Sequence, residues 1–418
     1  MALATMLLFA SAVSAVTADL APSALNLSQL IELARRDNKN LQAARFVIDI
    51  SRARLLQTGL RANPRLGISA RSDFLFGNDG EHGGALSLSE DFPIAGRLLR
   101  EKDVARVDVA LAETEVADAE RHLAGEVAAD VYRVLILDRQ IAARSALIEI
   151  ETGLAATTRE RYKAAEVSEL DVNTIEIDRQ RLLQERALAQ GQREQRLLSL
   201  NTRLGRAAAT PLQIDEPLPK LDALPGLPKL QAQALEHRAD LRGALLAADR
   251  ARAEQALAHA SRWQDWTLSL ELAQDKQVII GAPPQGTSHS IGVSVSIPLP
   301  LFNKGQGMVE AAQASEGQAQ AKIDSLRLDI NSEVAGAHAE ATRLQSVLGQ
   351  YAQQLLPISA NNVSLAQQGY RQGLIPIFDV VQVQRQQAEL NTIYLQTLDQ
   401  YLQALVRLHT AVGDYLKD

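Results

Sequence analysis

The sequence predicts a mainly α-helical protein with a small β part, built as two tandem structural repeats. Three observations lead to this prediction. The 418 residues are 46% hydrophobic but only 4% aromatic, a composition typical of long helices that pack side by side. Short stretches of alternating apolar and polar residues interrupt the helical pattern in each half of the chain. The pattern of the first half then recurs about 200 residues later, which is the mark of an internal duplication.

The N-terminal segment 1–18 carries no charge and ends in small residues, which predicts a cleavable export signal. The alternative for this segment is a buried N-terminal helix. No later segment approaches the ~20 consecutive apolar residues that a membrane-spanning helix needs. A net charge of −7 without a basic block argues against nucleic acid as a partner. The absence of cysteine excludes disulfides and thiolate metal sites.

The first repeat is expected over residues 19–205. In chain order it contains a helical region, two strands, a long helix and a return helix: 26–62, about 65–74, about 84–92, Arg97–Lys163 and about 171–204. The long helical run contains no proline. At ~1.5 Å per residue it predicts a rod of roughly 100 Å, far longer than a globular domain uses.

A proline-rich segment, 206–228, is expected to link the repeats in an extended conformation. The second repeat, 229–418, is expected to contain strands at about 266–273 and 290–297 and a second long hairpin. Five residues recur at an offset of 200: Leu41, Ala44, Asp49, Arg52 and Ala53 as Leu241, Ala244, Asp249, Arg252 and Ala253. Pro357 has no counterpart in the first repeat and is expected to kink or interrupt the second long helix.

Each long hairpin is expected to turn at a tip that shares one Tyr…Asp-Val frame. The two tips are 162–172 and 370–380. Gly373 suits the left-handed residue that ends a helix, and Pro376 suits the start of the next helix. Ala165 stands at the position of that glycine in the first tip, which predicts a different turn there.

Four strands per chain would leave two open sheet edges, which are unsatisfied in lipid and prone to aggregate in water. Closing a barrel therefore requires several copies of the chain, and three copies with four strands each would give a 12-stranded barrel. A water-soluble sheet packed on one face has the same alternation of residues. The strands alone leave both possibilities open.

Two strand-exit turns and the two tips form an ordered double set of motifs. The turns contain Pro93 and Gly96 in the first repeat and Pro298, Pro300 and Gly305 in the second, and the tips end in Asp171-Val172 and Asp379-Val380. This set resembles the TolC-like outer-membrane efflux family over nearly all of the chain after the signal. The whole sequence is most similar to the heavy-metal resistance branch of that family, the cobalt–zinc–cadmium or cobalt–nickel exporters.

The resemblance implies a homotrimer, with a 12-stranded β-barrel in the outer membrane that is continued by a long α-helical barrel in the periplasm. It implies outer-membrane lipid, a periplasmic adaptor protein and an inner-membrane RND pump as partners. The expected function is a passive conduit for divalent heavy-metal cations (cobalt, nickel, zinc or cadmium) from periplasm to exterior. The alternatives are a channel for drugs or peptides, a periplasmic coiled-coil adaptor, and a structural coiled-coil or filament protein.

Under this resemblance the hairpin tips form a periplasmic gate. Asp171 and Asp379 would place two carboxylates per chain near the axis of a trimer, and such a ring would concentrate cations. The alternative for Asp171 is helix capping, because Ser168 and Asp171 have capping-box spacing. Both roles can hold at once.

Tyr370 matches a gate-contact position of the family, whereas Tyr162 is expected to pack against a neighbouring helix. Ile375 stands where some members carry a basic gate residue. We therefore expect packing and the geometry of Gly373, not a salt bridge, to hold this gate.

No nucleophile elbow, phosphate loop or pair of catalytic carboxylates is found, so an enzyme and a cofactor are not expected. The seven histidines share no metal-ligand spacing. If the cargo is a metal ion, this chain is expected to conduct it without a dedicated metal site.

Overall fold

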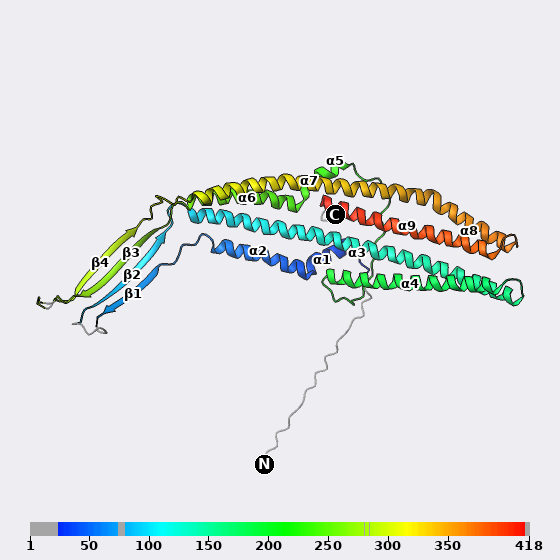
Figure 1. Ribbon diagram of the computed structural model, residues 1–418, viewed down its shortest axis with the longest axis horizontal. Helices are drawn as coiled ribbons and strands as arrows, with labels where there is room; N and C mark the ends of the chain where they lie inside the picture. Colours follow the sequence, from blue (N-terminus) through cyan, green and yellow to red (C-terminus); the bar gives the residue numbers. More distant parts are fainter. Residues whose placement is uncertain (1–23, 74–79, 280, 284, 414–418) are drawn as a thin grey trace, which may run out of the picture.

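The computed structural model describes residues 24–73, 80–279, 281–283 and 285–413. The predicted export signal, 1–18, lies outside the described residues. A four-stranded sheet forms one end of an elongated molecule, and the tips of two helical hairpins form the other end (Figure 1). Long helices run between the two ends, as the composition predicts.

The sheet is antiparallel, with its strands in sequence order: β1 Arg65–Ser72, β2 His82–Phe92, β3 Trp266–Lys276 and β4 Ser288–Ser296. Each repeat supplies one hairpin, and β2 pairs with β3 to join the two repeats. In the described chain β1 and β4 each have a neighbour on one side only. The sheet therefore has two open edges.

The register gives the sheet two chemically different faces. One row across the four strands is apolar and exposed: Leu66, Leu88, Leu270 and Val293. The next row, which points to the opposite face, is small or polar: Gly67, Ser87, Glu271 and Gly292. The sheet can therefore separate an apolar environment from an aqueous one.

The helices follow the predicted order. They are α1 Leu27–Asp37, α2 Lys39–Gln57, α3 Arg97–Lys163, α4 Glu169–Arg203, α5 Leu227–His237, α6 Ala239–Ala260, α7 Gln306–Gln350, α8 Leu356–Arg371 and α9 Ile377–Val412. The 67 residues of α3 make a rod of roughly 100 Å at ~1.5 Å per residue. None of the helices in the described part of the chain combines the length and apolar character that a membrane-spanning helix requires.

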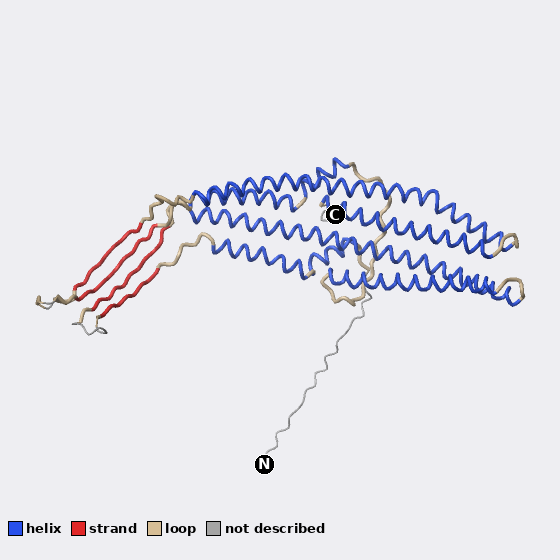
Figure 2. Tube along the Cα trace, in the orientation of Figure 1, coloured by secondary structure: helices blue, strands red, loops and turns tan. Residues whose placement is uncertain are grey.

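The helices form a curved layer in which immediate neighbours make most of the contacts (Figure 2). Near the tips α4 also contacts α9. Beside the sheet the spatial order is α2, α3, α6 and α7, and towards the tips it is α4, α3, α9 and α8. The layer is open at both sides, in line with the open edges of the sheet.

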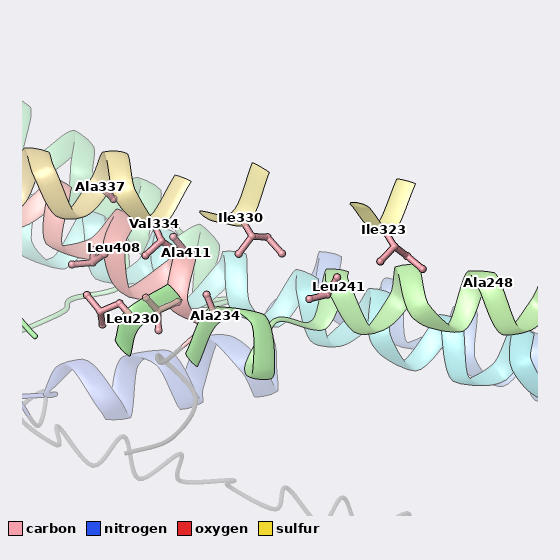
Figure 3. Packing of buried hydrophobic residues seen from close by; sticks show 11 residues of the cluster. Leu230, Ala234, Leu241, Ala248, Ile323, Ile330, Val334, Ala337, Leu408 and Ala411 are labelled. Carbon is pink, nitrogen blue, oxygen red and sulfur yellow. The ribbon is translucent and has the colours of Figure 1, made fainter. Parts of the chain in front are cut away.

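Buried side chains run along the layer in separate clusters. The cluster in Figure 3 joins α5, α6, α7 and α9 through Leu230, Ala234, Leu241, Ile330 and Leu408, among others. Alanines such as Ala234 and Ala411 are fully buried there. Small side chains let the helices of this cluster approach closely.

The return helix of the first repeat ends against the junction between α1 and α2. Gly205 follows α4 in the left-handed conformation, with φ of 70°, and a Cβ atom there would lie 2.0 Å from the Asp37 carbonyl oxygen. Asn38 caps α2 by accepting a hydrogen bond from the Leu41 amide at 2.8 Å. Its Nδ2 donates to the Arg203 carbonyl at 2.8 Å, so one buried amide joins the two helix ends.

The second repeat has the same junction with different chemistry. Arg238 occupies the junction between α5 and α6, and its Nη1 donates to the Ala411 carbonyl near the end of α9 at 3.2 Å. The guanidinium also pairs with Asp240 at 2.7 Å and with Glu333 at 2.6 Å. Gly413, with φ of 88°, takes the place of the first glycine. The ends of α4 and α9 are thus each held by a side chain from the junction of two short helices, Asn38 between α1 and α2 and Arg238 between α5 and α6.

The predicted interruption at Pro357 is confirmed. Helix α7 ends at Gln350, and a π-helix, Tyr351–Leu355, precedes α8. Pro357 lies in the first turn of α8. Because proline has no amide hydrogen to donate to the preceding turn, the regular α-helical ladder cannot continue through it, and a wider turn takes its place.

Candidate functional site at the hairpin tips

The tip of the second hairpin closes with the hydrogen bonds expected of a helix that ends at glycine. Gly373 has φ of 76° and donates its amide hydrogen to the Tyr370 carbonyl at 3.0 Å. Leu374 donates to the Gly369 carbonyl at 2.9 Å. Together they form a Schellman motif, after which Pro376 begins α9.

The prediction of a different turn in the first tip is wrong. Ala165 donates to the Tyr162 carbonyl and Glu166 to the Arg161 carbonyl, both at 2.9 Å, which is the same pair of bonds. Ala165 adopts the left-handed conformation with φ of 61°. The two bonds satisfy helix-end carbonyls, whereas the conformation costs alanine about 1–2 kcal/mol. The repeat therefore preserves the turn although the glycine is absent.

The two predicted gate carboxylates differ in their surroundings. Asp171 is half-buried, and its Oδ2 accepts hydrogen bonds from the Ser168 amide at 2.9 Å and the Ser168 hydroxyl at 2.7 Å. The capping box predicted for Ser168 and Asp171 is thus confirmed. Asp379 lies in the first turn of α9, and its side chain is exposed. Only Asp379 presents its carboxylate freely to the solvent.

A basic side chain does contact Tyr370, but it comes from the other tip. The Arg161 guanidinium lies 4.9 Å from the centre of the Tyr370 ring, which is a cation–π contact. Its Nε also donates to Glu166 at 3.0 Å. Sequence reasoning looked for the basic residue at Ile375 and missed Arg161. Tyr162 is 44% exposed in the single chain.

An apolar layer lies behind the tips. Its buried members come from α4, α8 and α9: Ile175, Ala366, Ile377, Val380 and Val381. Tyr370 packs against this layer, which therefore connects the two hairpins just behind the Arg161 contact.

A buried polar layer follows, one step further from the tips. Glu151 of α3 is 6% exposed and Asp178 of α4 is 4% exposed. Arg385 of α9 donates to Asp178 Oδ2 through Nη2, and through Nε at 3.0 Å. Burial, reinforced by the Asp178 charge, raises the pKa of Glu151 to about 7 against the opposing effect of Arg385 and Arg181.

Sequence reasoning also missed this polar layer, although a signal was present. Glu151 follows the buried Ile148 by three residues and precedes Leu154 by three, which places its carboxyl on the apolar face of α3. A charged residue on an apolar helix face is rarely buried without a partner. That pattern marks Glu151 for attention, but it does not reveal which residues face it.

The strand-exit residues lie where the sheet meets the long helices, far from the tips. Gly96 and Gly305 precede α3 and α7, with φ of 70° and 67°. Pro93, Pro298 and Pro300 lie in the connections between strands and helices. Their role is to turn the chain from the sheet into the two rods. No three histidine, aspartate or glutamate side chains meet as a potential metal site in the described segments.

A family model described as outer membrane efflux protein matches residues 30–206 and 230–414. The cobalt-zinc-cadmium resistance protein CzcC of Cupriavidus metallidurans is 22% identical over 391 residues, 93% of this chain and 90% of that protein. A membrane protein from Pseudomonas aeruginosa shares the fold with a TM-score of 0.75 and 20% identity, over 92% of both chains. The outer membrane protein VceC of Vibrio cholerae gives 0.72 and 19%, over 93% of this chain and 96% of that chain.

Proposed function

The chain belongs to the outer membrane efflux protein family, and on that premise we propose that it is the outer-membrane channel of a tripartite efflux system. It acts as a passive conduit from the periplasm to the exterior. The observation that carries the proposal is the sheet with one apolar and one polar face at the end of a rod of roughly 100 Å. Such a sheet suits a wall between lipid and water, and such a rod reaches far into the periplasm.

Three copies close the open edges. Strand β4 of one copy would pair with β1 of the next, giving a 12-stranded barrel, and α7 would pack on the neighbouring α2. Exposed apolar side chains on these two helices support that contact, with Phe46 64% and Leu328 71% exposed. Inside the chain α6 already packs on α3, with Arg250 bound to Asp108 at 2.5 Å. The contact between copies would repeat this contact between repeats.

The proposed cargo is a divalent heavy-metal cation: cobalt, nickel, zinc or cadmium. Its support is the similarity to CzcC, together with the acidic residues at the tips. A periplasmic adaptor and an inner-membrane RND pump would supply selection and energy. Drug or peptide export is the second candidate within the same channel class. The adaptor alternative fits less well, because the chain has two long hairpins and one small sheet.

The proposal is tested by deleting the gene and restoring it. Loss of the chain is expected to sensitise the cell to at least one of the four metals, and the wild-type chain should restore resistance. Restored protein should fractionate with the outer membrane as a trimer. Sensitivity to drugs alone would replace the metal proposal with the drug candidate, and a soluble monomer would refute the channel itself.

We propose further that Asp379 provides the cation-attracting charge of the gate. Asp379→Asn is expected to reduce the cation-to-anion permeability ratio by about twofold or more in planar bilayers at low salt, because an exposed carboxylate near the axis is weakly screened there. Asp171→Asn serves as the matched control. Its carboxylate is engaged with Ser168, so selectivity should change less. Equal effects of the two variants would contradict this assignment.

A further inference from the structure

We propose that Glu151 is a proton-binding site that fastens the α8–α9 hairpin to the α3–α4 hairpin, and that loss of its proton loosens the two tips. We call Glu151, Asp178 and Arg385 the interhairpin latch. The gating role of this latch rests on the proposed channel function. The pH-dependent separation of the two tips does not depend on that function.

The latch joins three helices close to the tips. Glu151 lies on α3, 12 residues before Lys163, which is a distance of roughly 18 Å along the helix. Asp178 lies on α4 and Arg385 on α9. The latch therefore contains residues of both hairpins. The apolar layer around Ile175 separates it from the tips.

The latch lacks a donor for one buried oxygen. Glu151 Oε2 is buried and makes no hydrogen bond to any described residue. Arg385, the cation of the latch, donates to Asp178 through both Nε and Nη2. A buried carboxylate without a donor is strongly disfavoured, whereas a carboxylic acid carries no charge and brings its own donor. The surroundings of Glu151 therefore favour its protonated, uncharged form.

Among the described residues, the charged groups that shift the pKa of Glu151 lie on neighbouring helices. Asp178 on α4 opposes its ionisation, while Arg385 on α9 and Arg181 on α4 favour it. Arg181 is 55% exposed and shared with Glu185 at 3.9 Å, so solvent screens its influence. Burial and Asp178 prevail, and the pKa of Glu151 rises to about 7 from an ordinary value of 4.5.

The direction of the pH effect follows from this raised pKa. The packed tips favour the protonated form, so the stabilisation is complete below about pH 4.5 and is lost as pH rises through about 7. Each unit of pKa difference corresponds to a tenfold change in the equilibrium constant. We expect the equilibrium between packed and separated tips to shift towards separation by roughly tenfold or more between pH 5 and pH 8.

The second hairpin has the freedom to respond. Helix α8 packs chiefly on α9 and on the π-helix Tyr351–Leu355, which interrupts the rod above it. Towards the tips, the second hairpin meets the first through the latch, the apolar layer and the Arg161–Tyr370 contact, in which Tyr370 belongs to α8. Weakening the latch removes one of these three connections.

The test measures tip separation directly. The chain has no cysteine, so spin labels can be placed at Lys163→Cys and Arg371→Cys, one exposed site on each tip. The full-length protein in detergent is expected to show a shortest interspin distance that increases from pH 5 to pH 8, with a midpoint below about 7. Glu151→Gln, which mimics the protonated acid, should keep the short distance at both pH values.

Two variants sharpen the assignment. Glu149→Gln, at an exposed position two residues away on α3, should behave like the wild type. Asp178→Asn should move the midpoint to lower pH by about one unit, because it removes a like charge and frees Arg385 for Glu151. This midpoint shift decides the matter even if thermal unfolding shows that Glu151→Gln is misfolded.

A tip distance independent of pH in the wild type would overturn the proposal. A pH response that persists unchanged in folded Glu151→Gln would also overturn it. Single-channel recordings at the same pH values separate the two proposals. If the tips move with pH but no conductance is found, the channel function fails while the latch stands.

Discussion

Gly205→Ala is expected to lower the free energy of unfolding by about 3–5 kcal/mol, the largest effect that we predict for a single methyl group. Two costs add at this site. The left-handed backbone disfavours any residue with a Cβ, at φ of 70°, and the new atom would lie 2.0 Å from the Asp37 carbonyl oxygen. Because that oxygen belongs to the backbone between α1 and α2, it can give way only if the junction moves. Urea unfolding followed by circular dichroism measures the loss.

Gly413→Ala is the matched control from the second repeat. Its backbone is also left-handed, with φ of 88°, but the nearest atom to a new Cβ would be the Cβ of His237 at an ordinary 3.6 Å. Only the conformational cost remains, so a loss of about 1–2 kcal/mol is expected. Equal losses for the two variants would show that the close approach at Gly205 contributes nothing.

Arg238→Met is expected to destabilise the chain by about 3–5 kcal/mol, because it removes the cation from a buried ion pair and leaves its partners in place. Arg238 is 7% exposed and binds Asp240, Glu333 and the Ala411 carbonyl. Methionine retains much of the packing of the aliphatic stem. The loss therefore reports on the charge and its hydrogen bonds, and it is measured by the same urea titration.

Arg252→Met provides the comparison on the surface. Arg252 also pairs with two carboxylates, Asp249 at 2.7 Å and Glu316 at 3.2 Å, but its side chain is 58% exposed. Surface ion pairs contribute about 0–1 kcal/mol, so this variant should remain close to the wild type. A loss as large as that of Arg238→Met would mean that burial is not what makes the Arg238 site important.

The periodic features of this protein could be predicted from the sequence. Helix α3 spans the predicted residues Arg97–Lys163, and the strands overlap the alternating segments, because side chains recur on one face with the period of each element. The interruption at Pro357 was equally predictable, since it follows from the chemistry of one residue. Local periodicity and local chemistry are enough for such features.

The contacts between the hairpins could not be predicted in this way. Arg161 and Tyr370 are about 200 residues apart, and nothing local to either residue indicates the other. The turn at Ala165 was mispredicted for a different reason. The left-handed conformation costs alanine about 1–2 kcal/mol, and the two local hydrogen bonds that close the helix form in spite of that cost. Glu151 could be flagged by its position, but its surroundings required the fold.

The two helix-end junctions have a consequence for how this gene has changed since it was duplicated. An uncharged amide at Asn38 and a guanidinium at Arg238 now carry out one inherited task, the anchoring of a return helix by its last carbonyls. The two repeats make the same contact with different residue types. The two halves of this chain are therefore better compared through equivalent contacts to the backbone than through identical residues at equivalent positions.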